Sequence, residues 1–152
     1  MLRDYGLVHR RLLGERLREI CRIKRLLFLV AGDGRLAATL SANGLHLRET
    51  QILEIPSWRT RYPNWLITVA AHSRKAVLKA GNAGAHAALI SPIFKTDSHP
   101  DAKPLGITKL RRLVALSPIP LYALGGLHPK NQAQLTNIGL AGIAGISGFA
   151  SS

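Results

Sequence analysis

The segment Ser91-Pro-Ile-Phe-Lys-Thr-Asp-Ser-His-Pro-Asp-Ala-Lys-Pro-Leu-Gly106 follows directly on an apolar run, Ala87-Ala-Leu-Ile90. The apolar run is typical of a short buried strand. The segment after it is a loop of hydroxyls, charges and prolines that closes just before a helical pattern. In α/β proteins, binding and catalytic groups gather in such loops at the carboxyl ends of rigid strands. We therefore predict a buried parallel strand that leads into a functional loop.

Two later segments have the same form, Leu121-Tyr-Ala-Leu-Gly-Gly126 and Gly142-Ile-Ala-Gly-Ile-Ser-Gly148. Earlier in the chain, short apolar runs begin at Leu26, Leu45 and Leu66. Six short apolar strands that alternate with helices predict a parallel sheet covered by helices.

The helices are expected at residues 9–25, 35–42, 73–80, 108–116 and 129–138. Ser73 and Thr108 are the expected caps, and Asn43-Gly44 is the expected stop of the second helix. Residues 48–64 contain two prolines and Trp58, and Trp65 follows directly. This composition predicts an irregular surface loop with one helical turn around residues 57–59, and with Trp58 and Trp65 as packing anchors.

Length and composition limit the classes of protein to which this chain can belong. The 152 residues suffice for one domain with a sizeable core, and no apolar run reaches the roughly 18 residues of a membrane helix. The first residues lack the layout of a signal peptide. One cysteine, Cys21, excludes an internal disulfide and a cysteine-rich zinc site. We expect a single domain over residues 1–152, located in the cytoplasm.

The formal net charge of +13, from 21 Lys+Arg against 8 Asp+Glu, is compatible with anionic partners, and a solvated basic face is the alternative explanation. Nucleic acid, an acidic membrane surface and phosphorylated small molecules all fit such a charge. Arginines of the first quarter are interleaved with leucines, and aromatic residues make up only 5% of the chain. Recognition of single strands by stacking is therefore poorly supported. A basic nucleic-acid-binding module remains the weakest of the alternatives.

Glycines at two consecutive strand ends predict a phosphate site. Gly125 and Gly126 precede an expected helix, where bare backbone and free N–H groups favour an anion. Ser147 offers a hydroxyl at the end of the last strand, and the loops after the last two strands of a barrel commonly bind phosphate. Simple turn geometry is the alternative for each glycine pair taken alone.

A family resemblance rests on these motifs in their order and spacing. Its motifs are residues 91–99, Pro104-Leu-Gly106, Ala123-Leu-Gly-Gly-Leu127, Ala144-Gly-Ile-Ser147, Asn43-Gly-Leu-His-Leu47 and Ala70-Ala-His-Ser73. Together they resemble the thiamine phosphate synthase / TenI family over essentially the whole chain. The resemblance implies an α/β fold of the (βα)8 TIM-barrel type.

The barrel is expected to be incomplete, with about six parallel strands. The family's first strand, first helix and most of its second strand have no counterpart, and Leu2-Arg-Asp4 resembles the end of that second strand. An open barrel leaves strand edges and an apolar interior uncovered. We expect a truncated reading frame, a partner that completes the sheet, or a domain taken from a longer chain.

The resemblance also implies a reaction and a set of site residues. Synthase members join a pyrimidine pyrophosphate to a thiazole phosphate, while TenI members carry out a thiazole tautomerisation in the same pocket. The implied residues are Gly125, Gly126, Ile146 and Ser147 for phosphate, Arg3, Thr96 and Ser98 for substrate, and His99 and His72 for catalysis.

Several positions depart from the family pattern. Mg²⁺ is expected as cofactor, but its ligand positions fall on Ala31-Gly32 and near Thr50 or Gln51. Tyr5 and His99 each stand where the family has a lysine, and the TenI catalytic histidine would fall on Pro92. The sequence favours a transferase of thiamine biosynthesis with an altered metal and pyrophosphate site.

A non-catalytic or TenI-like protein that binds thiazole phosphate is the main alternative. Phosphorylated thiazole and pyrimidine molecules are the expected partners, without a membrane, and a homo-oligomer is compatible with the sequence.

Overall fold

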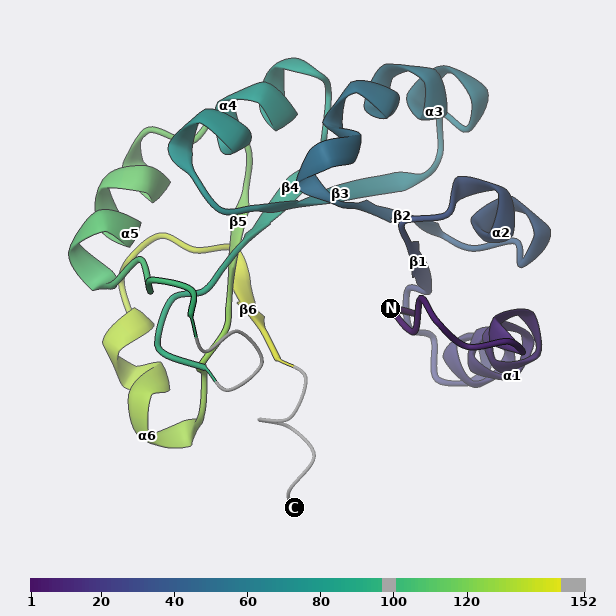
Figure 1. Ribbon diagram of the computed structural model, residues 1–152, viewed down its shortest axis with the longest axis horizontal. Coiled ribbons are helices and arrows are strands. Elements are labelled where there is room, and N and C mark those ends of the chain that lie inside the picture. The colour runs from purple at the N-terminus through teal and green to yellow at the C-terminus, as the bar shows by residue number, and fades with distance from the viewer. Residues whose placement is uncertain (97–100, 146–152) are drawn as a thin grey trace.

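The computed structural model describes residues 1–96 and 101–145. Six parallel strands lie in chain order in one sheet, which curls so that the helices cover its outer side (Figure 1). The strands are β1 (Leu29–Ala31), β2 (Gly44–Leu47), β3 (Leu66–Ala71), β4 (Ala87–Ile90), β5 (Leu121–Leu124) and β6 (Gly142–Ala144). The predicted parallel α/β sheet of the barrel type is confirmed.

Helices connect successive strands, as parallel pairing requires. The α-helices are α1 (Arg10–Ile23), α2 (Gly34–Thr39), α3 (Ile55–Arg61), α4 (Arg74–Asn82), α5 (Ile107–Ala115) and α6 (Pro129–Gln132). Two 3-10 helices, η1 (Glu49–Glu54) and η2 (Ala133–Leu135), adjoin α3 and α6. None of the helices in the described ranges is both long and apolar enough to cross a membrane.

The residues before α1 take part in the sheet. Leu2 forms a parallel bridge with Val30. Its N–H donates to the carbonyl of Leu29 at 2.8 Å, and its carbonyl accepts from the N–H of Ala31 at 2.9 Å. Leu2 thus pairs beside β1, at the place where the end of a strand was expected. β1 therefore has a partner on each side at this point.

The main core lies between the sheet and the outer helices. Leu45, Ile67 and Val69 face this core and are completely buried. Side chains alternate along a strand, so intervening residues such as Ala70 and Leu89 face the hollow side of the sheet, where they line a cavity. The outer face holds the fold together, and the inner face is available for function.

Residues 49–61 are helical, so the prediction of an irregular loop was wrong, although the single helical turn expected around residues 57–59 lies within α3. Pro56 lies in the first turn of α3, where proline costs no helical hydrogen bond. The prediction that the tryptophans are packing anchors is confirmed. Trp58 and Trp65 stack at 6.0 Å between ring centroids, and Tyr62 stacks on Trp65 at 3.9 Å.

Two predicted boundaries near β1 and β2 were also wrong. Helix α2 ends at Thr39, before the Asn43-Gly44 pair that was expected to stop it. The Asn43 side chain instead accepts from the N–H of Phe28 at 2.9 Å, and Gly44 begins β2. The strand expected from Leu26 begins at Leu29, because the residues just before Phe28 remain exposed.

The later helices differ at their ends. Ser73 caps α4 as predicted, and its hydroxyl accepts from the N–H of Ala76. Gly106, with φ of 74°, precedes α5 in the cap position that was expected for Thr108. Helix α6 has four residues and does not reach Ile138.

Candidate active site

A cavity of about 830 Å³ opens on the hollow side of the sheet, at the carboxyl ends of its strands. Its lining includes residues that directly follow five consecutive strands. These are Arg48 and Glu49 after β2, His72 after β3, Ser91 and Pro92 after β4, Gly125 and Gly126 after β5, and Gly145 after β6. Loops far apart in the sequence therefore meet at one cavity, as expected for a parallel sheet.

Five of the predicted site residues line this cavity: Arg3, His72, Thr96, Gly125 and Gly126. The other four, Ser98, His99, Ile146 and Ser147, lie outside the described residues. The strand ends selected from the sequence therefore do meet at one cavity, while the role of each residue stays a prediction.

Gly125 and Gly126 bring the loop after β4 against the end of β5. Both have positive φ, at 94° and 67°, which side-chain-bearing residues rarely adopt. A Cβ on Gly126 would lie 2.8 Å from the carbonyl carbon of Phe94, and one on Gly125 would lie 2.9 Å from Cα of Pro92. The Phe94 N–H donates to the Gly125 carbonyl at 3.1 Å. The glycines therefore admit the chain's own loop and so carry Thr96 to the cavity.

The start of α6 differs from the expected anion site. The helix has only four residues, and the N–H of His128 at its start donates to Oδ1 of Asn131 at 3.0 Å. The Asn131 amide in turn donates to the Gly126 carbonyl at 2.7 Å, and its side chain is buried. The prediction that this helix runs to about Ile138 was wrong, while the phosphate role of its start stays a prediction. Bare backbone at Gly125 and Gly126 remains the feature that fits phosphate.

Two contacts hold His72, one through its backbone and one through its ring. Its backbone N–H donates to the Glu49 carboxylate at 2.8 Å. Its Nδ1 lies 2.7 Å from the carbonyl oxygen of Ser91. A carbonyl only accepts, so Nδ1 carries the proton, and in the neutral ring Nε2 is the atom that can accept one.

His46 is a cavity residue that the sequence reasoning did not select. It is 7% exposed, and its Nδ1 lies 2.9 Å from the Thr68 hydroxyl oxygen. Burial, chiefly, together with the nearby charges of Arg3 and the amino terminus, lowers the pKa of His46 to about 4. The ring is therefore neutral near neutral pH. The signal was present in the sequence, since His46 lies between two core leucines and must point to the opposite face.

Arg48 is a second cavity residue that was missed. Its guanidinium carbon lies 4.2 Å from the centre of the Tyr5 ring, and that of Arg10 lies 5.3 Å from the same ring. Such distances fit cation–π attraction. Tyr5 also packs on Gly32, where a Cβ would lie 2.9 Å from the ring. An aromatic ring thus supports a cation at the mouth of the cavity.

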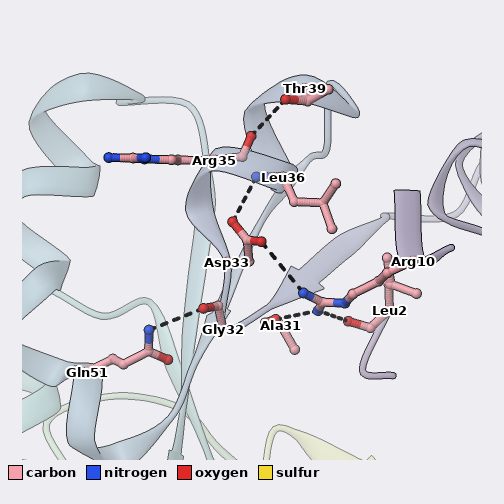
Figure 2. Close-up of polar contacts among 9 residues, drawn as sticks. All are labelled: Leu2, Arg10, Ala31, Gly32, Asp33, Arg35, Leu36, Thr39 and Gln51. Carbon is pink, nitrogen blue, oxygen red and sulfur yellow. Dashed lines mark hydrogen bonds and ion pairs between the residues drawn. The ribbon is translucent and has the colours of Figure 1, made fainter. Parts of the chain in front are cut away.

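Arg10 ties the first residues of the chain to β1, as Figure 2 shows. Its Nη2 donates to the Ala31 carbonyl at 2.6 Å and to the Leu2 carbonyl at 3.4 Å. Its Nη1 lies 3.8 Å from the Asp33 carboxylate, and only 12% of its side chain is exposed. This arginine is therefore structural rather than part of a solvated basic face.

The positions where the family resemblance places metal ligands are joined to each other. The Gln51 amide donates to the Gly32 carbonyl at 3.3 Å, and its oxygen accepts from the N–H of Arg48 at 3.2 Å (Figure 2 shows the first contact). Asp33, one place away, caps α2 by accepting from the N–H of Leu36. Within the ranges 1–96 and 101–145, no three His, Cys, Asp or Glu side chains form a group that could hold a metal ion.

A curled parallel sheet with outer helices and a cavity at the carboxyl ends of its strands defines the class of (βα)-barrel proteins. The profile described as "Thiamine monophosphate synthase" matches residues 2–149. The chain therefore belongs to the thiamine monophosphate synthase family, a family of thiamine biosynthesis.

Individual relatives agree with this assignment. A protein of Aquifex aeolicus provisionally named thiamine-phosphate synthase 2 is 35% identical over 97% of this chain and 80% of its own length. The thiamine-phosphate synthase of Latilactobacillus sakei is 34% identical over 84% of this chain. The structure of a thiamine phosphate pyrophosphorylase from Pyrococcus furiosus superposes with a TM-score of 0.77 at 27% identity over 90% of this chain.

This chain spans only part of most of these proteins. It covers 58% of the Latilactobacillus sakei protein and 64% of the Pyrococcus furiosus chain.

Proposed function

We propose that this chain binds thiazole phosphate and a pyrimidine diphosphate in its cavity and joins them to form thiamine phosphate. The observation that carries the proposal is the convergence of Arg3, Thr96, Gly125 and Gly126 on one cavity, in a chain of the thiamine monophosphate synthase family. Cytoplasmic location, a single domain and a homo-oligomeric state stay predictions.

The proposed reaction exchanges one bond for another at the pyrimidine methylene carbon. The carbon–oxygen bond to the diphosphate breaks, and its electron pair leaves with the diphosphate. The thiazole ring nitrogen then forms the new carbon–nitrogen bond. Such a reaction asks the protein chiefly to position two substrates and to neutralise the departing negative charge.

The two ends of the cavity suit these two tasks. At the β5 end, bare backbone at Gly125 and Gly126 and the hydroxyl of Thr96 would position the thiazole phosphate. At the other end, Arg3 and Arg48 would face the diphosphate. Between them, Nε2 of His72 is oriented to hold or accept a proton.

The expected Mg²⁺ does not fit the described residues. Glu49 is the only carboxylate among the described residues that line the large cavity, and it already accepts from the N–H of His72. Gly32 offers no side chain, and Gln51 is committed to hydrogen bonds. Mg²⁺ prefers several oxygen ligands in octahedral geometry, which this set does not provide.

The direct test is synthesis of thiamine phosphate from the two substrates, measured with and without Mg²⁺. Product formation at a rate proportional to protein concentration supports the proposal. No product in either condition, from protein that is folded by circular dichroism, contradicts the enzymatic reading.

A second measurement addresses the thiazole end of the cavity. The Thr96→Ala variant removes a hydroxyl that lines the cavity, and we expect about 5-fold weaker binding of thiazole phosphate by calorimetry. The matched control is Thr60→Ala on α3, whose hydroxyl donates to the Pro56 carbonyl away from the cavity. Equal effects of the two variants would contradict the placement.

The same titration separates the enzyme from its main alternative. Binding of thiazole phosphate without any turnover would favour a non-catalytic binding protein. The departures at Tyr5 and Gly32 are the observations that favour this second candidate, because they remove a lysine and a metal ligand that the family resemblance implies.

A further inference from the structure

The cavity is lined by more positively charged side chains than a single phosphate would require. Arg3, Arg48 and Lys95 line it, opposed by one carboxylate, Glu49, among the described lining residues. Three permanent cations against one anion favour a ligand that carries several negative charges. Two of the three, Arg3 and Arg48, belong to the first part of the chain, far from the glycines of the β5 end.

Arg48 is positioned before any ligand arrives. Its backbone N–H donates to the Gln51 side chain at 3.2 Å, and its guanidinium lies over the Tyr5 ring. Stacking on an aromatic ring restrains the long side chain while leaving the donors at the edge of the guanidinium plane unused by the ring. Those donors match phosphate oxygens, which they can bind two at a time.

The space near Arg48 is filled by the protein. Gly32 has φ of 71°, and a Cβ there would lie 2.9 Å from the Tyr5 ring and 3.6 Å from Nε of Arg48. An aspartate at this position would clash with Tyr5 and would be strained. Gln51 closes the other side by donating to the Gly32 carbonyl. Tyr5, Gly32, Arg48 and Gln51 thus form one packed cluster, which we call the Arg48 cluster.

We propose that the Arg48 cluster, together with Arg3, binds a diphosphate group without a metal ion. The guanidinium of Arg48 supplies charge at the place where a metal with carboxylate ligands would otherwise be required. This inference deepens the proposed function, because it assigns the diphosphate end of the substrate and the means by which its charge is neutralised.

The test is calorimetric titration of the full chain with inorganic pyrophosphate at physiological salt, in EDTA and then in excess Mg²⁺. We expect binding in EDTA that Mg²⁺ does not tighten, since the metal would cancel charge that the arginines recognise. Inorganic phosphate is expected to bind more weakly than pyrophosphate. Binding that requires Mg²⁺ would overturn the proposal.

Two arginine variants make the test specific. Arg48→Gln should weaken pyrophosphate binding by about 10-fold or more, because it removes a charged bidentate donor. Arg61 is an exposed arginine in the last turn of α3, and Arg61→Gln removes the same net charge. This variant should change pyrophosphate binding less than 2-fold, because salt screens exposed charges beyond ~10 Å. Equal losses in the two variants would show that only overall charge matters and would overturn the proposal.

Variants of Tyr5 test whether its aromatic ring supports Arg48. Tyr5→Phe keeps the ring face and should bind pyrophosphate as the unmodified chain does, whereas Tyr5→Leu should bind more weakly. Retained thiazole phosphate affinity and an unchanged melting temperature in Arg48→Gln would show that only the diphosphate end has changed. Failure of thiamine phosphate synthesis would leave the metal-free binding of pyrophosphate measurable, so the two proposals can fail separately.

Discussion

The two ends of the cavity present different groups to a ligand. The β5 end presents backbone: Gly125 and Gly126 lie against the loop after β4, and Asn131 braces the Gly126 carbonyl. The β1 and β2 end presents side chains, with Arg48 over Tyr5. Geometry at the first end depends on the absence of side chains, whereas charge at the second depends on which side chains are present.

This difference explains where the chain keeps its family pattern and where it departs from it. A glycine with positive φ and backbone atoms, rather than a side chain, within 3 Å admits almost no substitution. A charged end can be rearranged, because one arginine can take over a charge lost elsewhere provided that it is supported. The glycine motifs match the family, while Tyr5 and Gly32 depart from it.

The largest expected effect concerns the backbone end. Gly126→Ala should lower the free energy of unfolding by about 4 kcal/mol, because it combines strain at positive φ with overlap on the backbone of Phe94. Urea denaturation measures the change. The control is Gly6→Ala, where an added Cβ would meet nothing within 4 Å. If both variants were equally stable, the packed-backbone account of this end would be wrong.

Next in size is the pH dependence that His46 gives to the side-chain end. Its pKa falls from the ordinary 6.5 to about 4 in the folded chain, chiefly through burial. As the pH falls, the unfolded chain therefore binds the proton first. The stability contributed by the neutral ring is present above pH 6.5 and is lost as the pH falls from 6.5 towards 4.

For His46 this loss amounts to about 3 kcal/mol. A His46→Asn variant lacks it, so its free energy of unfolding should fall less between pH 7 and pH 4 than that of the unmodified chain. Urea denaturation at several pH values gives both profiles. Parallel profiles would show that the pKa of His46 in the folded chain is close to its ordinary value.

The smallest of these three expected effects concerns Arg10, which ties the first residues of the chain to β1. Arg10→Ala removes donors to the Leu2 and Ala31 carbonyls and should destabilise the chain by about 2 kcal/mol. Its neighbour Arg11 makes only an exposed pair with Glu15, and Arg11→Ala should leave the unfolding midpoint unchanged. An equal shift in both variants would mean that the buried contacts add nothing.

Local patterns predicted the sheet better than they predicted the connections. Alternation of apolar runs and helices predicted six parallel strands, since a fully buried strand needs an apolar residue at nearly every position. Apart from one turn, the helical stretch after β2 was missed because Pro56 and the tryptophans are typical of a loop. Their helix is stabilised by aromatic stacking with Tyr62 and Trp65, which is tertiary packing.

The candidate site divides in the same way. The pattern of strand ends identified Gly125 and Gly126, whereas the family resemblance implied Thr96, His72 and Arg3. It did not identify Arg48, because an arginine after a strand is common and nothing local marks one as supported by Tyr5.

The sequence by itself determined that strand ends would meet at one polar edge and that glycines would lie at one end of it. Both follow from short-range rules: the two-residue period of strands and the freedom of glycine at positive φ. Only the tertiary structure decided that Arg10 is buried, that His46 is neutral and that Arg48 rests on Tyr5. Those properties depend on burial and on charges from distant parts of the chain, because electrostatic strength is set by surroundings rather than by neighbours in sequence.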